Sequence, residues 1–161
     1  MQTGAGQCGG WNGSDAAFLE LLTKMVFATG FSRAVVERRW PAFREAFARF
    51  DPAVLAGFDE RAVEFLLNRQ SGIVRNARKV RATLENARIC AALAGEYGSL
   101  EKYCAHVQSL GQVAGCRLLA KAFRSVGDST AQAIWRELRG GDEGGGPCVT
   151  SGPGLAESVV P

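Results

Sequence analysis

At 161 residues the chain has the length of one domain, and it contains no apolar run long enough to span a bilayer. The formal charge of +3, from 19 Lys and Arg against 16 Asp and Glu, gives no reason by itself to expect a polyanionic partner. The five cysteines are widely spaced and the only histidine is His106, so we expect reduced thiols and no zinc site, which takes four ligands in close pairs.

The two ends of the chain differ in composition from its middle. Residues 1–14 are rich in Gly, Gln and Ser, and residues 140–161 are rich in Gly and Pro. Such segments bury too little apolar surface to offset the conformational entropy that ordering removes. The sequence therefore predicts two disordered tails around a helical domain over residues 15–139, which is long enough to form one hydrophobic core.

Helical periodicity begins directly after the first tail. Asp15 is the expected N-cap of an amphipathic helix that ends at Gly30. Ser32 is the expected cap of a second helix, and Pro41 indicates the first turn of a third helix with phenylalanines along one side. These signals predict a series of short helices joined by tight turns.

The rest of the domain continues the helical pattern. Asp51 and Asp59 each precede a short apolar run and predict two more short helices. The longest helical pattern covers residues 74–97, and a turn over residues 125–129 separates the last two helices. Because the alternation typical of strands is almost absent, the predicted fold is all-α, a compact orthogonal array of short helices.

One segment of this domain is strongly basic. It contains six cations, with Glu85 as its only acid: Arg69, Arg75, Arg78, Lys79, Arg81 and Arg88. A local patch of this kind can attract phosphate while the whole chain stays near neutral. A solvated helix face is the alternative interpretation of the same charges.

The last two helices have the layout of a helix-hairpin-helix. An apolar helix is followed by a tight turn at Gly127, and Ser129 and Thr130 open the next helix. Backbone N–H groups at a helix start, with hydroxyls beside them and Arg124 nearby, predict a site for a backbone phosphate. Asp128 opposes that role because its carboxylate repels phosphate. An ordinary pair of helices joined by a Gly turn is the alternative.

Four segments in this order carry a resemblance to a known family. They read FATGF at 27–31, WPAFREAF at 40–47, FDP at 50–52 and GIVRNARKV at 72–80. In order and spacing they resemble landmarks of the DNA-3-methyladenine glycosylase I family, and the resemblance covers about residues 17–138. It implies a helix-hairpin-helix DNA glycosylase fold.

The resemblance also implies an activity. Proteins of this type bind duplex DNA, flip a damaged purine out of the stack and hydrolyse its N-glycosidic bond, which starts base excision repair of alkylation damage. The corresponding expectation is a monomer that needs no cofactor and does not associate with a membrane. It would work in the nucleoid-containing cytoplasm, or in the nucleus of a eukaryotic cell.

Several roles transfer from the family onto matching positions of this chain. The loop that wedges into the vacated base stack falls at Gly30 and Phe31, although folding of Phe31 back onto the core is the alternative. The phosphate-binding hairpin falls at Gly127, Ser129 and Thr130. The resemblance adds supporting cations from the basic segment: Arg75, Arg78 and Lys79.

The base-pocket positions depart from the family pattern. Met25 stands where the family has the glutamate that reads the flipped base, and Arg33 stands where it has a stacking tryptophan. Met25 can pack against a purine but cannot accept its amino hydrogens. The next acid, Glu37, is the remaining catalytic candidate, with a solvated helix residue as the alternative. The Cys and His zinc ligands of the family have no counterparts, so no metal is expected.

These departures leave other hypotheses open beside an active glycosylase. A catalytically silent DNA-binding module would keep the hairpin and the wedge without the base pocket. A helical protein-interaction domain would have no DNA affinity at all, and its binding would not depend on salt as phosphate binding does.

Overall fold

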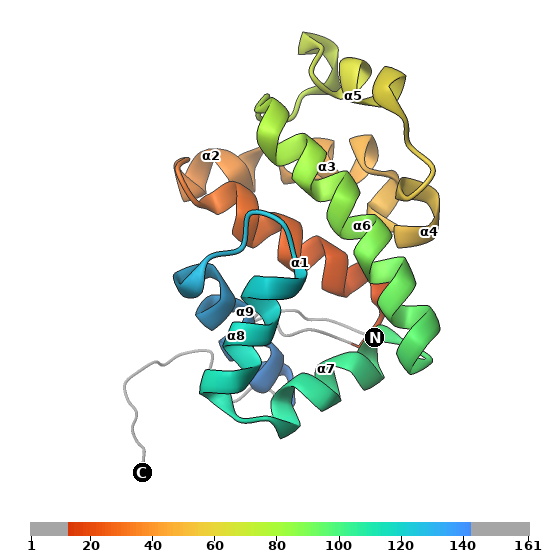
Figure 1. The fold of residues 1–161 in the computed structure, drawn as a ribbon. Coiled ribbons are helices and arrows are strands. Elements are labelled where there is room, and N and C mark those ends of the chain that lie inside the picture. Colours follow the sequence, from red (N-terminus) through yellow and green to blue (C-terminus); the bar gives the residue numbers. More distant parts are fainter. Residues whose placement is uncertain (1–12, 143–161) are drawn as a thin grey trace.

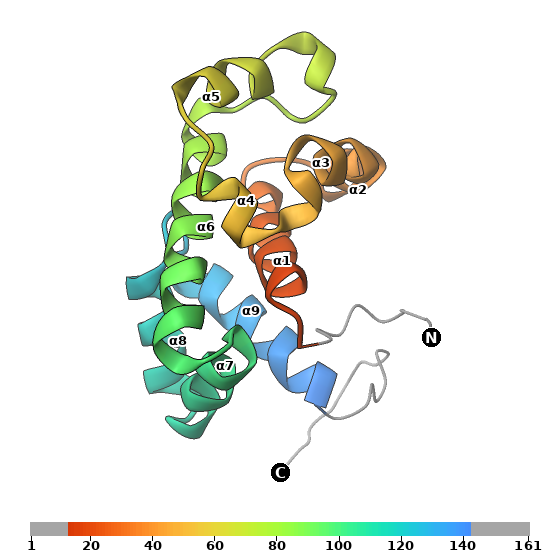
Figure 2. The same cartoon turned by 90° about the vertical axis from the view of Figure 1, so that its right-hand side faces the viewer.

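The fold is all-α, as predicted, over residues 13–142, which are the residues that the computed structural model describes (Figures 1 and 2). The predicted tails fall largely on residues 1–12 and 143–161, which lie outside this range. The α-helices in chain order are α1 (Asp15–Ala28), α2 (Arg33–Arg38), α3 (Trp40–Ala46), α4 (Pro52–Leu55), α5 (Glu60–Leu66), α6 (Ala77–Tyr97), α7 (Leu100–Ser109), α8 (Gln112–Ala122) and α9 (Asp128–Asp142). Two short 3-10 helices, η2 (Ala48–Phe50) and η3 (Arg69–Ser71), join them.

Side-chain caps set most of the helix starts. The predicted caps of α2, α4 and α5 are confirmed, because each side-chain oxygen accepts a backbone N–H of the first turn: Ser32, Asp51 and Asp59. The cap of α1 is Ser14 rather than Asp15. Asp15 instead accepts the backbone N–H of Leu100 at 3.0 Å and ties α1 to α7, a contact that no local pattern announces.

Helix α6 starts three residues later than its apolar pattern suggests. The Asn76 side chain accepts the backbone N–H of Lys79 at 3.0 Å and caps the helix, which leaves residues 74 and 75 outside it. The helix then runs for 21 residues through the centre of the molecule, beside α1. Figure 1 shows that it passes from the end that carries α5 to the end that carries α7.

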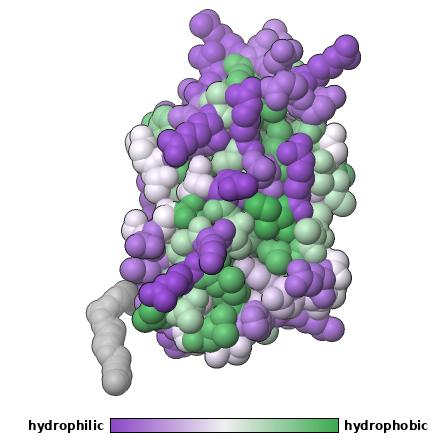
Figure 3. Space-filling view, in the orientation of Figure 1, coloured by the Kyte–Doolittle hydropathy of each residue, from purple (hydrophilic) through white to green (hydrophobic). Residues whose placement is uncertain are grey.

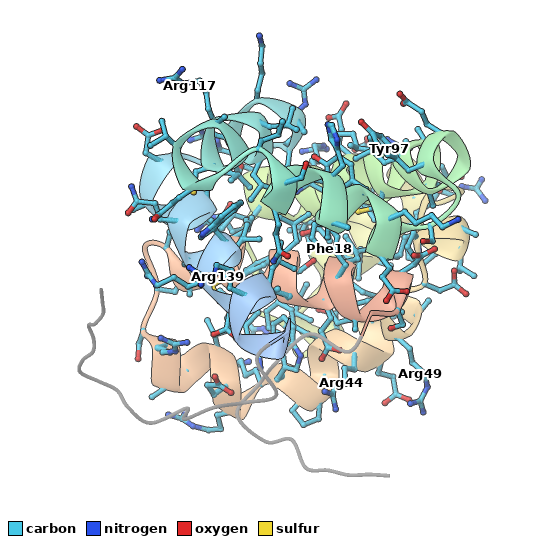
Figure 4. The ribbon with its side chains drawn as sticks, turned by 90° about the horizontal axis from the view of Figure 1, so that it is seen from below. Phe18, Arg44, Arg49, Tyr97, Arg117 and Arg139 are labelled. Carbon is cyan, nitrogen blue, oxygen red and sulfur yellow. The ribbon has the colours of Figure 1, made fainter. Side chains whose placement is uncertain are left out.

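The core lies between α1, α6 and the surrounding short helices. Its largest fully buried side chains are mostly aromatic, and Trp40 stacks on Phe43 and Phe50 with ring centroids 4.7 and 5.4 Å apart. Phe18 on α1 meets Phe123 at 5.7 Å and so joins the first helix to the end of α8. Figure 4 shows Phe18 inside the molecule and Arg44 and Arg49 at its rim.

The α8–α9 pair packs closely because α8 carries a glycine at the contact. A Cβ at Gly115 would lie 2.4 Å from the Trp135 ring and 2.8 Å from the Val107 carbonyl oxygen. Only hydrogen fits there, so α8 can approach both α7 and α9. In the space-filling view of Figure 3, hydrophobic residues reach the surface between hydrophilic ones over the middle and lower part of the molecule.

Candidate nucleic-acid interface

The first turn of α6 holds the end of α1. The Lys79 ammonium donates to the carbonyl oxygens of Val26, at 2.7 Å, and Thr29, and to the Thr29 hydroxyl at 3.0 Å. It also lies 5.3 Å from the centre of the Phe31 ring. Burial lowers the pKa of this ammonium, and the neighbouring Arg78 cation lowers it further. Lys79 therefore connects two segments that are 50 residues apart in sequence.

Two turns further along α6, Asn86 holds the hairpin between α8 and α9. This side chain is 1% exposed, accepts the backbone N–H of Arg124 at 2.7 Å and donates to the Arg124 carbonyl oxygen at 3.2 Å. Both backbone groups of one hairpin residue are thus satisfied by one buried amide. Thr83 lies between Lys79 and Asn86 along the helix and is also buried.

The two held segments border one groove of about 590 Å³. Its walls come from the end of α1, the start of α6 and the hairpin, and its lining includes four cations and no acid: Arg78, Lys79, Lys121 and Arg124. Outside the lining, Glu85 pairs with Arg124 at 3.8 Å. A concave surface of this charge favours an anion such as a backbone phosphate.

The groove brings together some of the residues that the sequence singled out and leaves others aside. Arg78, Lys79, Arg124 and Gly127 line it. Ser129 and Thr130 are in the first turn of α9, where Ser129 is exposed and Thr130 is 6% exposed, and neither lines the groove. Arg75, exposed in the segment before α6, does not line it either.

The predicted wedge lies beside the groove. Gly30 has a φ of +84°, which turns the chain sharply between α1 and α2 and favours glycine. Phe31 follows it, is partly buried and packs against the edge of the core. The Phe31 ring therefore contacts the core and also lies close to the Lys79 ammonium.

The predicted base-pocket residues occupy a different setting. Met25 is partly buried on α1 and packs against the core, and Arg33 is exposed at the start of α2. Glu37 pairs with Lys24 at 3.6 Å. This side of the molecule therefore contains acids and cations that compensate one another.

Glu137 of α9 belongs to the same charged set. Burial raises the pKa of its carboxyl, while the cations Arg33, Arg136 and Lys24 act in the opposite direction. The carboxyl is therefore within electrostatic reach of α1 and α2. Sequence reasoning passed over Glu137 because it lies in the last helix, more than a hundred residues from Arg33.

Sequence reasoning also missed Lys121, Thr29 and Asn86. Lys121 could have been found from the helix-hairpin-helix layout, since it lies one turn before the hairpin. Asn86 has a weaker signal, a polar residue on the apolar side of a long helix. Thr29 gives no sequence signal, because its role depends on a lysine 50 residues away.

Comparison with known proteins identifies the family of this chain. The model of the methyladenine glycosylase family matches residues 8–139. The chain belongs to the methyladenine glycosylase family. The match includes the predicted wedge loop, the basic start of α6 and the hairpin, so the groove is made of segments that the family model covers.

Solved structures of methyladenine glycosylases share the fold. A crystal structure of 3-methyladenine DNA glycosylase I superposes with a TM-score of 0.69 at 23% identity, covering 81% of this chain and 81% of that chain. The structure of this enzyme from Staphylococcus aureus has a TM-score of 0.68 at 19% identity, covering 78% and 76%. A 3-methyladenine DNA glycosylase I variant in complex with 3-methyladenine has a TM-score of 0.68 at 20% identity, covering 78% and 77%.

Two further features of this family member concern metals and membranes. Within residues 13–142, no group of three or more His, Cys, Asp or Glu side chains is arranged to hold a metal ion. Cys8 and Cys148 lie outside that range. Of the described helices, none combines the length and the apolar character that crossing a membrane requires.

Proposed function

We propose that this protein is a DNA glycosylase that removes methylated purines, of the 3-methyladenine type, from duplex DNA. The observation that carries the proposal is the basic groove, in which the end of α1, the start of α6 and the hairpin meet around four cations, directly beside the predicted wedge loop. A duplex backbone passing through this groove would have a phosphate at the hairpin and the damaged nucleotide near Phe31. DNA with a damaged base is accordingly the proposed partner, in the cytoplasm beside the nucleoid or in a nucleus.

The chemistry asks little of a general base. Hydrolysis breaks the bond between the sugar C1′ and the purine nitrogen, and the bonding electrons leave with the base. Water adds its oxygen to C1′ and releases one proton to the solvent. A purine methylated at a ring nitrogen carries a positive charge and leaves as a neutral molecule, so its departure is already favoured. An enzyme for such a substrate gains most from flipping and holding the nucleotide.

The residues near the proposed base pocket favour a restricted version of this activity. Met25 offers a polarisable apolar surface to a flipped purine but accepts no hydrogen bond. Glu37 is paired with Lys24, and Glu137 lies within reach of Arg33. The protein would then select a damaged purine by its shape and by the lower free energy needed to flip it out of the stack. Hydrogen bonding to the amino group of the purine would not be needed.

A second candidate is a silent DNA-binding module, and the Met25 and Arg33 substitutions favour it. Such a protein would use the same groove and would hold damaged or abasic duplexes without cleaving the glycosidic bond.

Release of methylated adenine decides between the two. The purified full-length chain is incubated with methylated duplex DNA, and free bases are separated by chromatography. Release above the uncatalysed rate supports the glycosylase. Salt-dependent duplex binding without release indicates the silent module, and the absence of any duplex binding contradicts both.

A further inference from the structure

The Lys79 side chain lines the groove, yet its N–H donors are used by groups of the protein itself. An ammonium has three N–H donors. The structure pairs Lys79 with three acceptors, which are the carbonyl oxygens of Val26 and Thr29 and the Thr29 hydroxyl. In this arrangement no N–H group of Lys79 remains for a phosphate oxygen.

All three acceptors belong to the end of α1, directly before the wedge loop. The last turn of α1 contains no basic residue of its own, although carbonyl oxygens at a helix end favour a cation. Lys79 supplies that cation from another helix. Gly30 follows at once, and a Cβ placed on it would lie 3.9 Å from the Lys79 nitrogen, so the ammonium lies against the turn itself.

The same ammonium faces the Phe31 ring. Its nitrogen is 5.3 Å from the ring centroid, within the range of cation–π attraction. The neighbouring cation, Arg78, lines the same groove and is exposed, and its side chain forms no hydrogen bond or ion pair with any residue in the range 13–142. Two adjacent cations of one groove therefore differ in what they hold.

We propose that Lys79 is a positioning residue for the wedge: it fixes the end of α1 and the Phe31 loop, whereas Arg78 supplies charge to the groove. This inference rests on the proposed function, because a wedge has a role only in a protein that opens a base stack. It assigns to Lys79 an effect on discrimination between an intact and an opened duplex. A phosphate contact would act on both duplexes alike.

Two matched variants test the proposal. Lys79→Met and Arg78→Met each remove one positive charge from the same groove. The dissociation constants of an intact duplex and of a duplex with a stable abasic-site analogue are measured by fluorescence anisotropy at one salt concentration. Arg78→Met should weaken both by the same factor and keep their ratio, whereas Lys79→Met should lower the abasic preference about tenfold.

A double variant identifies the path of the effect. If Lys79 acts through the wedge, Phe31→Ala should lower the abasic preference as Lys79→Met does, and combining the two should add little. Thr29→Val is a milder variant that removes only one acceptor of the ammonium, and it should shift the preference in the same direction by a smaller factor. A Lys79→Met protein with the same duplex ratio as Arg78→Met would overturn the proposal.

Hydrogen exchange keeps the proposal testable even when the proposed function fails. In the free protein, amides of residues 29–32 should exchange faster in Lys79→Met than in wild type or Arg78→Met, because the loop loses its anchor. Equal exchange in the three proteins would overturn the positioning role. A wild-type protein that binds no duplex would contradict the proposed function, while the exchange result would still decide what Lys79 holds.

Discussion

The groove and the side of the molecule around Arg33 use charge in opposite ways. The groove lining gathers four cations and no acid. Around Arg33, by contrast, acids and cations alternate: Lys24 pairs with Glu37, and Glu137 is within electrostatic reach of Arg33. Nearby, Glu20 accepts from both Trp40 and Arg44 at 2.6 Å.

This difference distinguishes two roles of cations in this family member, which are pairing with acids inside the protein and attracting an external anion. Charges that the protein compensates hold helices together and are worth little to an external ligand. Arg124 pairs with Glu85, and Lys79 donates to the end of α1. Arg78 and Lys121 are therefore the groove cations whose side chains form neither an ion pair nor a hydrogen bond with another described residue. Such cations are available to an anion, and their attraction falls with salt. The groove lining is therefore suited to an anion, whereas charges around Arg33 are balanced within the protein.

The largest expected effect concerns the close packing of α8 against α7 and α9, which positions the hairpin beside the groove. Gly115→Ala should lower the free energy of unfolding by about 3 kcal/mol, because the new methyl group overlaps the Trp135 ring and the Val107 carbonyl oxygen. Urea unfolding followed by circular dichroism measures it. Gly95→Ala is the control, since nothing lies within 4 Å of that Cβ, and it should raise stability slightly. Equal effects would contradict the close helix contact.

The second prediction tests whether the groove cations bind DNA more strongly than the compensated cations do. Replacing Arg78 and Lys121 by Gln should weaken duplex binding about 100-fold near physiological salt and reduce the salt slope by roughly two. The matched control removes two compensated cations, Arg44 and Arg81, which pair with Glu20 and Glu60. Anisotropy titrations at several salt concentrations should show little change for the control. Similar losses in both double variants would mean that total charge, and not the groove, governs binding.

A third variant asks whether the hairpin depends on α6. Asn86→Ala should cost about 2 kcal/mol of stability, because it leaves the backbone N–H and carbonyl of Arg124 unpaired near the core. Arg124→Ala keeps both backbone hydrogen bonds, so it should weaken duplex binding with little loss of stability. Denaturant unfolding and anisotropy together distinguish the two, and a stable Asn86→Ala protein would argue against the clamp.

A smaller change concerns backbone strain in the hairpin. Ser125 has a φ of +61° in the turn before Gly127, a conformation that costs a non-glycine residue free energy. Ser125→Gly should raise the free energy of unfolding by about 0.5–1 kcal/mol. Ser129→Gly, in the first turn of α9, should lower it instead. Thermal unfolding compares the two, and a destabilised Ser125→Gly protein would contradict the strain.

The smallest expected effect depends on pH. The folded-state pKa of Glu137 lies above its usual value of 4.5, so the folded state favours the protonated acid and pays for ionisation as pH rises. Glu137→Gln should therefore be slightly more stable than wild type near pH 7. The difference should vanish below about pH 4.5, where both side chains are neutral. A difference in urea midpoint between wild type and Glu137→Gln that does not change with pH would contradict the raised pKa of Glu137.

Much of the fold followed from local sequence signals. Ser32, Asp51 and Asp59 cap the helices as expected, since a cap needs only its own residue and the next three. Asp15 misled for the opposite reason: its carboxylate bonds to Leu100, 85 residues away. The basic segment was visible as composition, but only Arg78 and Lys79 of its six cations line the groove.

The sequence by itself determined the class of the fold, the starts of several helices such as α2, α4 and α5, and the family, because caps, apolar periodicity and ordered landmarks are local properties. Only the tertiary structure decided which cations face an open groove and which are compensated. Lys79 meets the end of α1 across 50 residues, and Asn86 meets the hairpin across 38. Helical periodicity specifies the side of α6 on which they lie, whereas packing of α1 and the α8–α9 pair supplies their partners.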